Sequence, residues 1–220
     1  MDTESEIPWE RFAAFVRQHT HDVRNGLNSL DLEMALLHEL VAEGEGRACI
    51  DRVRSQVRAL GGQMRSLSAL FQEPKPSAAP LAAQEVFHIW NEQQAGLPAP
   101  LEVKWVNELG EEQVSVDAGM IATVFRELLA NAAAFSEGST VTASARRAGG
   151  DVLFELSEPK RSALDTTAWG RPLATKRRGG YGLGLWSVRR LLDANHARFV
   201  QAYLPDEGVL LSRISFPICK

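Results

Sequence analysis

A histidine, a carboxylate and an amide lie within one short stretch near the start of the chain. Asp22 directly follows His21, and Asn25 comes four residues after the histidine, one helical turn away on the same face. A neighbouring carboxylate can accept a hydrogen bond from one imidazole nitrogen, which fixes the tautomer and leaves the other nitrogen as a nucleophile. These residues predict a reactive histidine, and a surface histidine without function is the alternative. His19 has no acid after it and is the weaker candidate.

The segment that carries His21 has the spacing of a helix with an apolar seam. The steps between seam positions alternate between four and three residues along Val16, Thr20, Val23, Leu27, Leu30, Met34, Leu37 and Val41. This alternation is typical of a helix that packs in a heptad pattern. Because His21 directly follows the seam position Thr20, we expect it at the flank of the seam, pointing toward solvent.

A second seam follows a glycine-containing turn at residues 43–46. Its positions are Ile50, Val53, Val57, Leu60, Met64, Leu67 and Phe71, and Gly61 and Gly62 are expected to be exposed interruptions. Two helices joined by so short a turn run antiparallel. One hairpin has too little bulk to bury both stripes. We therefore expect residues 1–74 to form a homodimer with a four-helix bundle, and packing against the rest of the same chain is the alternative.

Residues 75–80 are predicted to be a linker. The stretch 73–80 holds three of the ten prolines and has no apolar period, so neither helix nor strand is expected in it. Beyond it, expected helices and strands alternate. The expected helices are 81–94, 118–135 and 183–195, and the expected strands are 101–106, 114–116, 140–146, 152–156, 199–203 and 209–216. Mostly antiparallel strands in this order predict a two-layer α/β sandwich, and an α+β chain overall.

Composition excludes several classes of function. A net charge of -4 and a pI near 5.8 give no basic footprint for nucleic acid. The two cysteines have no spacing typical of a disulfide framework or a zinc site. The acidic N-terminus argues against a signal peptide, and no apolar run is expected to span a membrane. We therefore expect a cytoplasmic protein without a membrane span, for which any sensing outside the cell would require a separate sensor protein.

The stretch from His21 to Leu27 resembles the phosphoacceptor box of two-component sensor histidine kinases. The usual box reads His, Glu or Asp, Leu, Arg, Asn or Thr, Pro, Leu, and this chain departs from it at Gly26. The resemblance implies that His21 accepts a phosphoryl group and that Asp22 orients the ring and takes its proton. It also implies a response-regulator receiver domain as partner. Asn25 matches the position that orients water when the partner is dephosphorylated.

Residues 125–135 are similar to the asparagine box of the ATPase domain that histidine kinases share with type II topoisomerases and heat-shock chaperones. Glu127 and Asn131 lie one turn apart, and their oxygen atoms suit a hard cation such as Mg²⁺. The resemblance implies an ATP-binding domain over residues 81–220, of the GHKL or Bergerat type, in which Asn131 holds the metal. Ala134 stands where that family often has a basic residue.

A second glycine-rich stretch at 179–190 looks like the glycine box and ATP lid of the same kinases. Glycines that lead into a helix let backbone amides approach phosphate oxygens at the positive end of the helix dipole. The residues expected to contact the nucleotide are Lys176, Gly180, Gly182, Leu183 and Gly184. A loop that only begins a helix is the structural alternative.

The first glycine box of the family is degenerate in this chain. Kinases of this type place Asp-x-Gly-x-Gly after the central strand, and the aspartate accepts a hydrogen bond from the adenine amino group. Here Glu158 stands at the acceptor position, one methylene longer, and Pro159 and Lys160 follow it. Lys160 adds bulk where a glycine is expected. The residues expected to bind adenine are therefore the weakest part of the resemblance. The residues expected to contact the phosphates match the family pattern more closely.

Three functions are compatible with these residues. The leading one is ATP-dependent autophosphorylation on His21, followed by phosphotransfer to a receiver aspartate. The second is an ATP-independent phosphotransferase that relays phosphoryl groups between receiver domains, and the degenerate adenine box favours it. The third is a non-catalytic dimeric scaffold, against which the pair of His21 and Asp22 argues.

Overall fold

The computed structural model describes residues 9–97, 99–135, 140–161, 164, 169 and 182–219. The chain divides into two compact units, Met1–Glu73 and Pro74–Lys220. The division falls at the proline-rich stretch.

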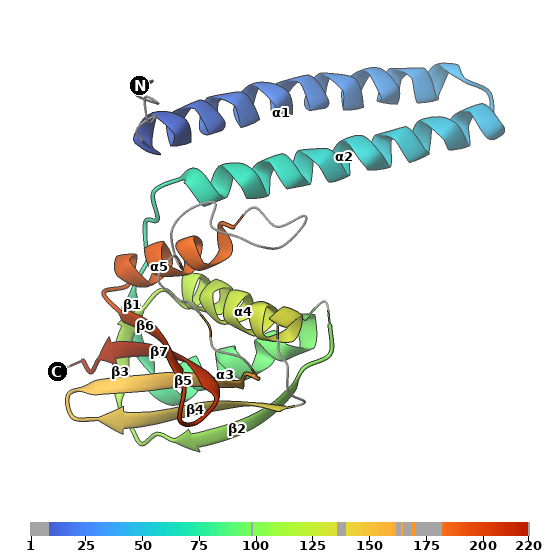
Figure 1. The fold of residues 1–220 in the computed structure, drawn as a ribbon. Helices are drawn as coiled ribbons and strands as arrows, with labels where there is room; N and C mark the ends of the chain where they lie inside the picture. Colours follow the sequence, from blue (N-terminus) through green and yellow to red (C-terminus); the bar gives the residue numbers. More distant parts are fainter. Residues whose placement is uncertain are drawn as a thin grey trace, which may run out of the picture. The chain divides into compact units, whose positions relative to one another are not determined.

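The first unit is an antiparallel helical hairpin (Figure 1). Helix α1 spans Trp9–Leu40 and helix α2 spans Glu45–Phe71. Its small core holds Ala13 and Thr20 from α1 and three residues from α2, Ile50, Val57 and Phe71. Four of these five residues are predicted seam positions, and Ala13 comes before the first seam.

Helix α2 continues through the two adjacent glycines. The expectation that both are exposed is wrong, because Gly61 is buried and Gly62 is half-buried. Gly61 follows the buried Val57 by one turn and so shares its inward face. A glycine inside a helix costs about 1 kcal/mol relative to alanine. The helical turns before and after the two glycines are enough to keep α2 continuous through them.

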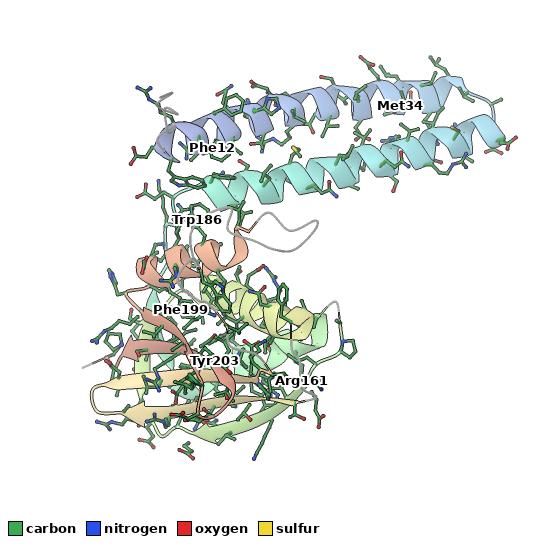
Figure 2. All side chains as sticks on the ribbon, viewed as in Figure 1. Phe12, Met34, Arg161, Trp186, Phe199 and Tyr203 are labelled. Atoms are coloured by element: carbon green, nitrogen blue, oxygen red, sulfur yellow. The ribbon has the colours of Figure 1, made fainter. Side chains whose placement is uncertain are left out.

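Polar and aromatic contacts hold the hairpin along its length. At the end away from the turn, the ring of Phe12 (Figure 2) lies 5.5 Å from that of Trp9 and 6.1 Å from that of Phe71. Arg17 Nη1 donates to the carbonyl of Phe71 at 2.9 Å. In the middle, Asp31 accepts from Arg54 at 3.1 Å. These contacts tie two helices that share few buried apolar side chains.

Large apolar side chains stay exposed on the hairpin. They are Phe15, Leu30, Leu32, Leu36, Leu37, Leu40, Val53 and Leu60. Four of these are predicted seam positions, with 38–47% of their surface exposed: Leu30, Leu37, Val53 and Leu60. One hairpin therefore leaves its own seams partly exposed.

The second unit is built on a mixed five-stranded sheet with strand order β2-β4-β5-β7-β6. The strands are β2 (Glu102–Glu108), β4 (Thr140–Ala148), β5 (Asp151–Pro159), β6 (Arg198–Leu204) and β7 (Val209–Pro217). Strands β2 and β4 are parallel, and the other pairs are antiparallel. Helices α3 (Ala83–Glu92), α4 (Ala118–Phe135) and α5 (Gly184–Ala194) cover one face of the sheet (Figure 1), which gives the predicted two-layer sandwich.

A small second sheet corrects the sequence prediction at the start of this unit. Strand β1 (Ala79–Ala82) pairs antiparallel with β3 (Gln113–Val116), so residues 79–82 are neither linker nor helix. Pro80 is tolerated because both strands of a two-stranded sheet are edges, where a missing amide donor is harmless. Helix α3 then begins at Ala83, and a 3₁₀ turn, Gln93–Gly96, follows it.

Aromatic side chains fill the core between the helices and the sheet. Trp90 of α3 stacks on Phe125 of α4 with ring centroids 4.9 Å apart, and Phe154 of β5 lies 5.9 Å from Trp90. All three side chains are fully or almost fully buried. The core thus fixes α4 against the central strand β5.

Helix α4 corrects the expectation that no apolar run could span a membrane. This helix has 18 residues and a mean hydropathy of 1.2. By length and composition alone, it is therefore long and apolar enough to cross a membrane. The buried positions of α4 are Ile121, Val124, Phe125, Leu128, Leu129 and Ala132. They belong to the core of the sandwich, so packing on the sheet accounts for the apolar character of α4.

Asp117 fixes the beginning of α4. Its Oδ1 accepts a hydrogen bond from the amide of Met120 at 2.9 Å, and its Oδ2 accepts from the amide of Ser77 at 2.8 Å. Its own amide donates to Oδ1 of Asn195, just after α5, at 2.6 Å. Hydrogen bonds from the amides of Met120 and Ser77 hold the pKa of the Asp117 carboxyl below its usual 3.8. One residue therefore joins three parts of the chain: its carboxylate contacts the proline-rich stretch and α4, and its amide contacts the end of α5.

Candidate functional site

The three residues predicted to do chemistry lie together on the exposed surface of α1. Nδ1 of His21 is 3.3 Å from Oδ1 of Asp22 and 3.3 Å from Nδ2 of Asn25. The His21 side chain is 54% exposed. Both contacts use Nδ1, so Nε2 is the nitrogen that can serve as nucleophile. The structure therefore brings the predicted trio together at the predicted flank of the seam.

The two contacts of His21 belong to different tautomers. A protonated Nδ1 donates to Asp22, whereas an unprotonated Nδ1 accepts from the amide of Asn25. Only the first arrangement leaves a lone pair on Nε2. Asp22 thus selects the nucleophilic tautomer, and Asn25 is next to the ring without competing for Nε2.

Gln18 is a member of this cluster that sequence reasoning missed. Its Nε2 lies 3.0 and 3.1 Å from the two carboxylate oxygens of Asp22. The hydrogen bond from Gln18, followed by that from His21, holds the pKa of the Asp22 carboxyl below its usual range. The signal was available, because Gln18 lies four residues before Asp22 on the same helix face. Asp22 is therefore kept ionised beside the imidazole.

Thr20 explains how a polar residue can occupy the seam. It is 3% exposed, and its hydroxyl donates to the carbonyl oxygens of Val16 and Arg17 at 2.8 and 2.9 Å. Its polar group is thus satisfied within α1. Burial of Thr20 sets the rotation of the helix and keeps His21 on the exposed side.

The second predicted cluster lies where α4 meets the beginning of α5. Glu127 and Asn131 are both half-buried on α4. A Cβ added to Gly184 would lie 3.1 Å from Oε2 of Glu127, so the absence of a side chain there permits the close approach. Leu183 is buried, and Gly182 has a φ of 64°, a conformation that favours glycine. The structure thus places Glu127 against the glycine-rich start of α5.

Two of the predicted nucleotide contacts, Lys176 and Gly180, lie outside the described residues. Among the residues that the structure does describe, no group of three or more histidine, cysteine, aspartate or glutamate side chains could hold a metal. An Mg²⁺ ion in such a site would depend on Asn131 and on phosphate and water oxygens. The metal role of Asn131 therefore stays a prediction.

The carboxylate expected to accept a hydrogen bond from adenine, that of Glu158, is already in contact with a lysine of this chain. Glu158 and Lys160 are only 4% and 8% exposed, and Nζ of Lys160 lies 3.1 Å from Oε2 of Glu158. The same Nζ donates to the carbonyl of Phe135 at 2.8 Å. Burial raises the pKa of the Glu158 carboxyl above its usual range, and the Lys160 ammonium offsets this only in part. The adenine end of the site therefore does not fit ATP as it stands.

The burial of Glu158 could have been found from the sequence. Val152, Phe154 and Leu156 alternate along β5 and are buried on the side of the helices. Glu158 continues that alternation, so it points to the same side. Its partner Lys160 comes two residues later, just after the strand. A carboxylate on a buried strand face needs a charged partner, which the next cation in the sequence provides.

Comparisons with solved structures show what the two units are similar to. Full-length ShkA in complex with AMPPNP matches with a TM-score of 0.67 and 18% identity, over 94% of this chain and 46% of ShkA. The Acinetobacter baumannii histidine kinase AdeS matches with a TM-score of 0.51 and 13% identity, over 92% of this chain and 97% of that structure. The mycobacterial sensor histidine kinase MprB matches with a TM-score of 0.51 and 15% identity, over 64% of this chain and 97% of that structure.

No family model and no curated protein matches the sequence. The chain spans less than half the length of ShkA. At these identities the matches show a shared fold. That fold is the helical region and α/β domain of a sensor histidine kinase core, as the sequence predicted.

Proposed function

We propose that this chain, which has the fold of a sensor histidine kinase core, transfers phosphoryl groups through His21 to and from a receiver aspartate of a response regulator. One observation carries the proposal: Nδ1 of an exposed histidine faces an ionised carboxylate, which leaves Nε2 as a nucleophile. The proposed location is the cytoplasm, where receiver domains are found.

The geometry of His21 suits attack on phosphorus. Nε2 forms the new nitrogen–phosphorus bond while the bond from phosphorus to the oxygen of the donor breaks, and the donor leaves as its anion. Phosphorylation at Nε2 puts positive charge on the ring. Asp22 stabilises this charge or takes the proton from Nδ1. In the next step a receiver carboxylate attacks the phosphorus, and the neutral imidazole is restored.

The phosphoryl donor is proposed to be a phosphorylated receiver aspartate. This favours the second of the three functions predicted from the sequence. The reason is that the ammonium group of Lys160 already contacts the carboxylate of Glu158, which is the acceptor expected for the adenine amino group. An acyl phosphate on a receiver needs no nucleotide site on this chain. A relay between two receiver domains then follows from the chemistry of His21 alone.

ATP-dependent autophosphorylation is the second candidate. What favours it is the close approach of Glu127 on α4 to Gly184 at the start of α5, the place expected for phosphates and Mg²⁺. The solved structure of ShkA, which has the same fold, is a complex with AMPPNP. Under this candidate the chain binds Mg-ATP through Asn131 and the lid, in spite of its degenerate adenine box.

A homodimer is proposed because the hairpin leaves its seams partly exposed. A second copy has the same complementary stripes and forms a four-helix bundle with the first. Light scattering coupled to size exclusion tests this directly. The expected mass is twice that of the 24.2 kDa chain. A monomer at all concentrations would contradict the proposal.

Radiolabel distinguishes the candidates. Receiver domains labelled with radioactive acetyl phosphate are expected to pass an acid-labile, alkali-stable label to the wild type and not to His21→Ala. His19→Ala is the matched control, because it removes an exposed histidine two positions earlier on the same helix. Label from Mg-ATP that depends on His21 would instead support the kinase. If neither donor labels the protein, the scaffold function remains.

A further inference from the structure

We propose that Lys160 is an internal ligand: its ammonium group takes the place of the adenine amino group on Glu158 and closes this end of the nucleotide site. The inference deepens the proposed phosphotransfer, because it removes ATP as a phosphoryl source. Only the consequence for the donor rests on that function. The closure itself is a property of the second unit.

The position of Lys160 follows from β5. The strand ends at Pro159, and Glu158 and Lys160, two residues apart, both lie inside the domain. The amide of Lys160 donates to the carbonyl of Gly208 at 2.8 Å, which fixes its backbone beside the β6–β7 turn. Arg161, which follows it, is exposed and is labelled in Figure 2. The chain therefore sends one cation inward and the next one outward.

The side chain of Lys160 does two things at once. Nζ contacts Oε2 of Glu158 and donates to the carbonyl of Phe135, the last residue of α4. The last carbonyls of a helix have no partner within the helix, and they lie at the negative end of its dipole. An ammonium group is the natural cap for such an end. Lys160 thus fastens the end of α4 to the end of β5.

Adenine would have to displace this arrangement. Its amino group is a neutral donor, whereas Lys160 is a charged donor already in contact with the same carboxylate. Moving the lysine away would leave a buried carboxylate and a helix carbonyl without their cation. The lysine side chain also fills space that a glycine at this position leaves open to the base. Both charge and volume therefore favour the internal ligand over the nucleotide.

The consequence is a domain that is complete without nucleotide. The contacts that a bound base would make with Glu158 are made by the chain itself. Phosphoryl groups on His21 must then come from a donor outside this domain, and an acyl phosphate of a receiver has the required chemistry. This agrees with the relay function proposed above.

The test is a calorimetric titration of the full chain with ADP. The double variant E158D/K160G, which restores Asp-x-Gly, is expected to bind ADP at least about tenfold more tightly than wild type. Arg213→Ala is the matched control, because it breaks another ion pair to β5, with Glu155 at 2.6 Å, and leaves Lys160 in place. It should behave as wild type. Wild type that binds ADP as tightly as the double variant would overturn the proposal.

Two further measurements complete this test. Inorganic tripolyphosphate should bind wild type and E158D/K160G equally, because the change lies at the adenine end, and a gain for tripolyphosphate would overturn the proposal. If the double variant does not fold, thermal unfolding of wild type decides. A ligand that binds only the folded state raises the Tm. A Tm that ADP raises no more than tripolyphosphate does supports the closure, and a larger rise with ADP refutes it. None of these readouts involves His21, so the outcome is separate from that of the phosphotransfer assay.

Discussion

The two units of this chain differ in the exposure of their candidate functional pairs. In the hairpin, His21 and Asp22 are exposed, with 54% and 60% of their side-chain surfaces accessible. In the sandwich, Glu158 and Lys160 are buried and satisfy each other. A group that exchanges phosphoryl with another protein must be accessible to it, and Glu158 and Lys160 are not accessible. The contrast supports two proposals made above, that the chemistry lies on the hairpin and that the pair of Glu158 and Lys160 closes the adenine end of the expected nucleotide site.

The apolar side chains show the reverse distribution. The sandwich buries its aromatic residues in one core, while the hairpin exposes most of its leucines. We expect the sandwich, with its buried aromatic core, to be stable by itself, whereas the partly exposed seams of the hairpin favour the proposed dimer. Changes in the two units should therefore have separable effects. The predictions below use that separation.

The largest effect is expected for Lys160→Met. The variant leaves Glu158 buried without a cation and the carbonyl of Phe135 without a donor, which should destabilise the sandwich by about 3–5 kcal/mol. Because burial raises the pKa of Glu158, the folded state prefers the protonated acid. The loss should therefore be greatest at high pH and shrink as the pH falls. Urea unfolding followed by tryptophan fluorescence measures it.

The control for that prediction is E158Q/K160M, which removes both charges. It should recover most of the lost stability, because replacing a buried ion pair by neutral groups is often close to neutral. A loss for K160M no larger than that for E158Q/K160M would show that the pair is not a structural contact. Phosphotransfer through His21 should be unchanged in both.

Asp22→Asn tests the hairpin side of the comparison. Asparagine cannot balance the charge on the phosphorylated ring or take its proton, so we expect phosphotransfer to slow by about a hundredfold. The fold should be unaffected because Asp22 is exposed. Gln18→Ala removes only the hydrogen bonds to Asp22 and should have a much smaller effect. Rates come from transfer of label at fixed concentrations of receiver. An unchanged rate for D22N would mean that Asp22 does not orient His21.

Asp117→Ala should destabilise the sandwich by about 1–2 kcal/mol, because α4 loses its cap. Asp117→Asn keeps an oxygen acceptor and should lose less. The pKa of Asp117 is lowered in the fold, so its contribution is fully present above its ordinary value of 3.8 and is lost as the pH falls through the folded value. Chemical unfolding across acid pH should show this loss in wild type and not in D117N. Equal pH dependence of the two would rule out the proposed role.

The smallest effect is expected for Gly26→Ala in the hairpin. A Cβ at this position meets no atom within 4 Å, and alanine favours the helix by about 1 kcal/mol. The variant should therefore raise the thermal midpoint of the hairpin, as measured by far-ultraviolet circular dichroism. Gly46→Ala is the contrasting variant, since an added Cβ there would lie 3.2 Å from Cγ1 of Val41. Destabilisation by G26A would show that α1 needs glycine for a bend or a partner.

Much of this arrangement could be predicted from local patterns. The spacing of Val16 and Thr20 located His21 on the flank of α1, and apolar periodicity placed α4 at Ala118–Phe135. Strand β1 could not be predicted, because a proline-rich stretch becomes a strand only when β3 is beside it. The Lys160 contact to Phe135 joins residues 25 positions apart, so it depends on the assembled sandwich. Local chemistry is readable from sequence, whereas contacts between elements require the fold.

The central claim is that His21 is a phosphoacceptor supplied from outside this chain. The most direct measurement incubates wild type and His21→Ala with a receiver domain labelled by radioactive acetyl phosphate, and in parallel with labelled Mg-ATP. We predict alkali-stable label on wild type from the receiver alone, and none on H21A from either donor. Label on wild type from ATP, or equal label on H21A from the receiver, would contradict the account.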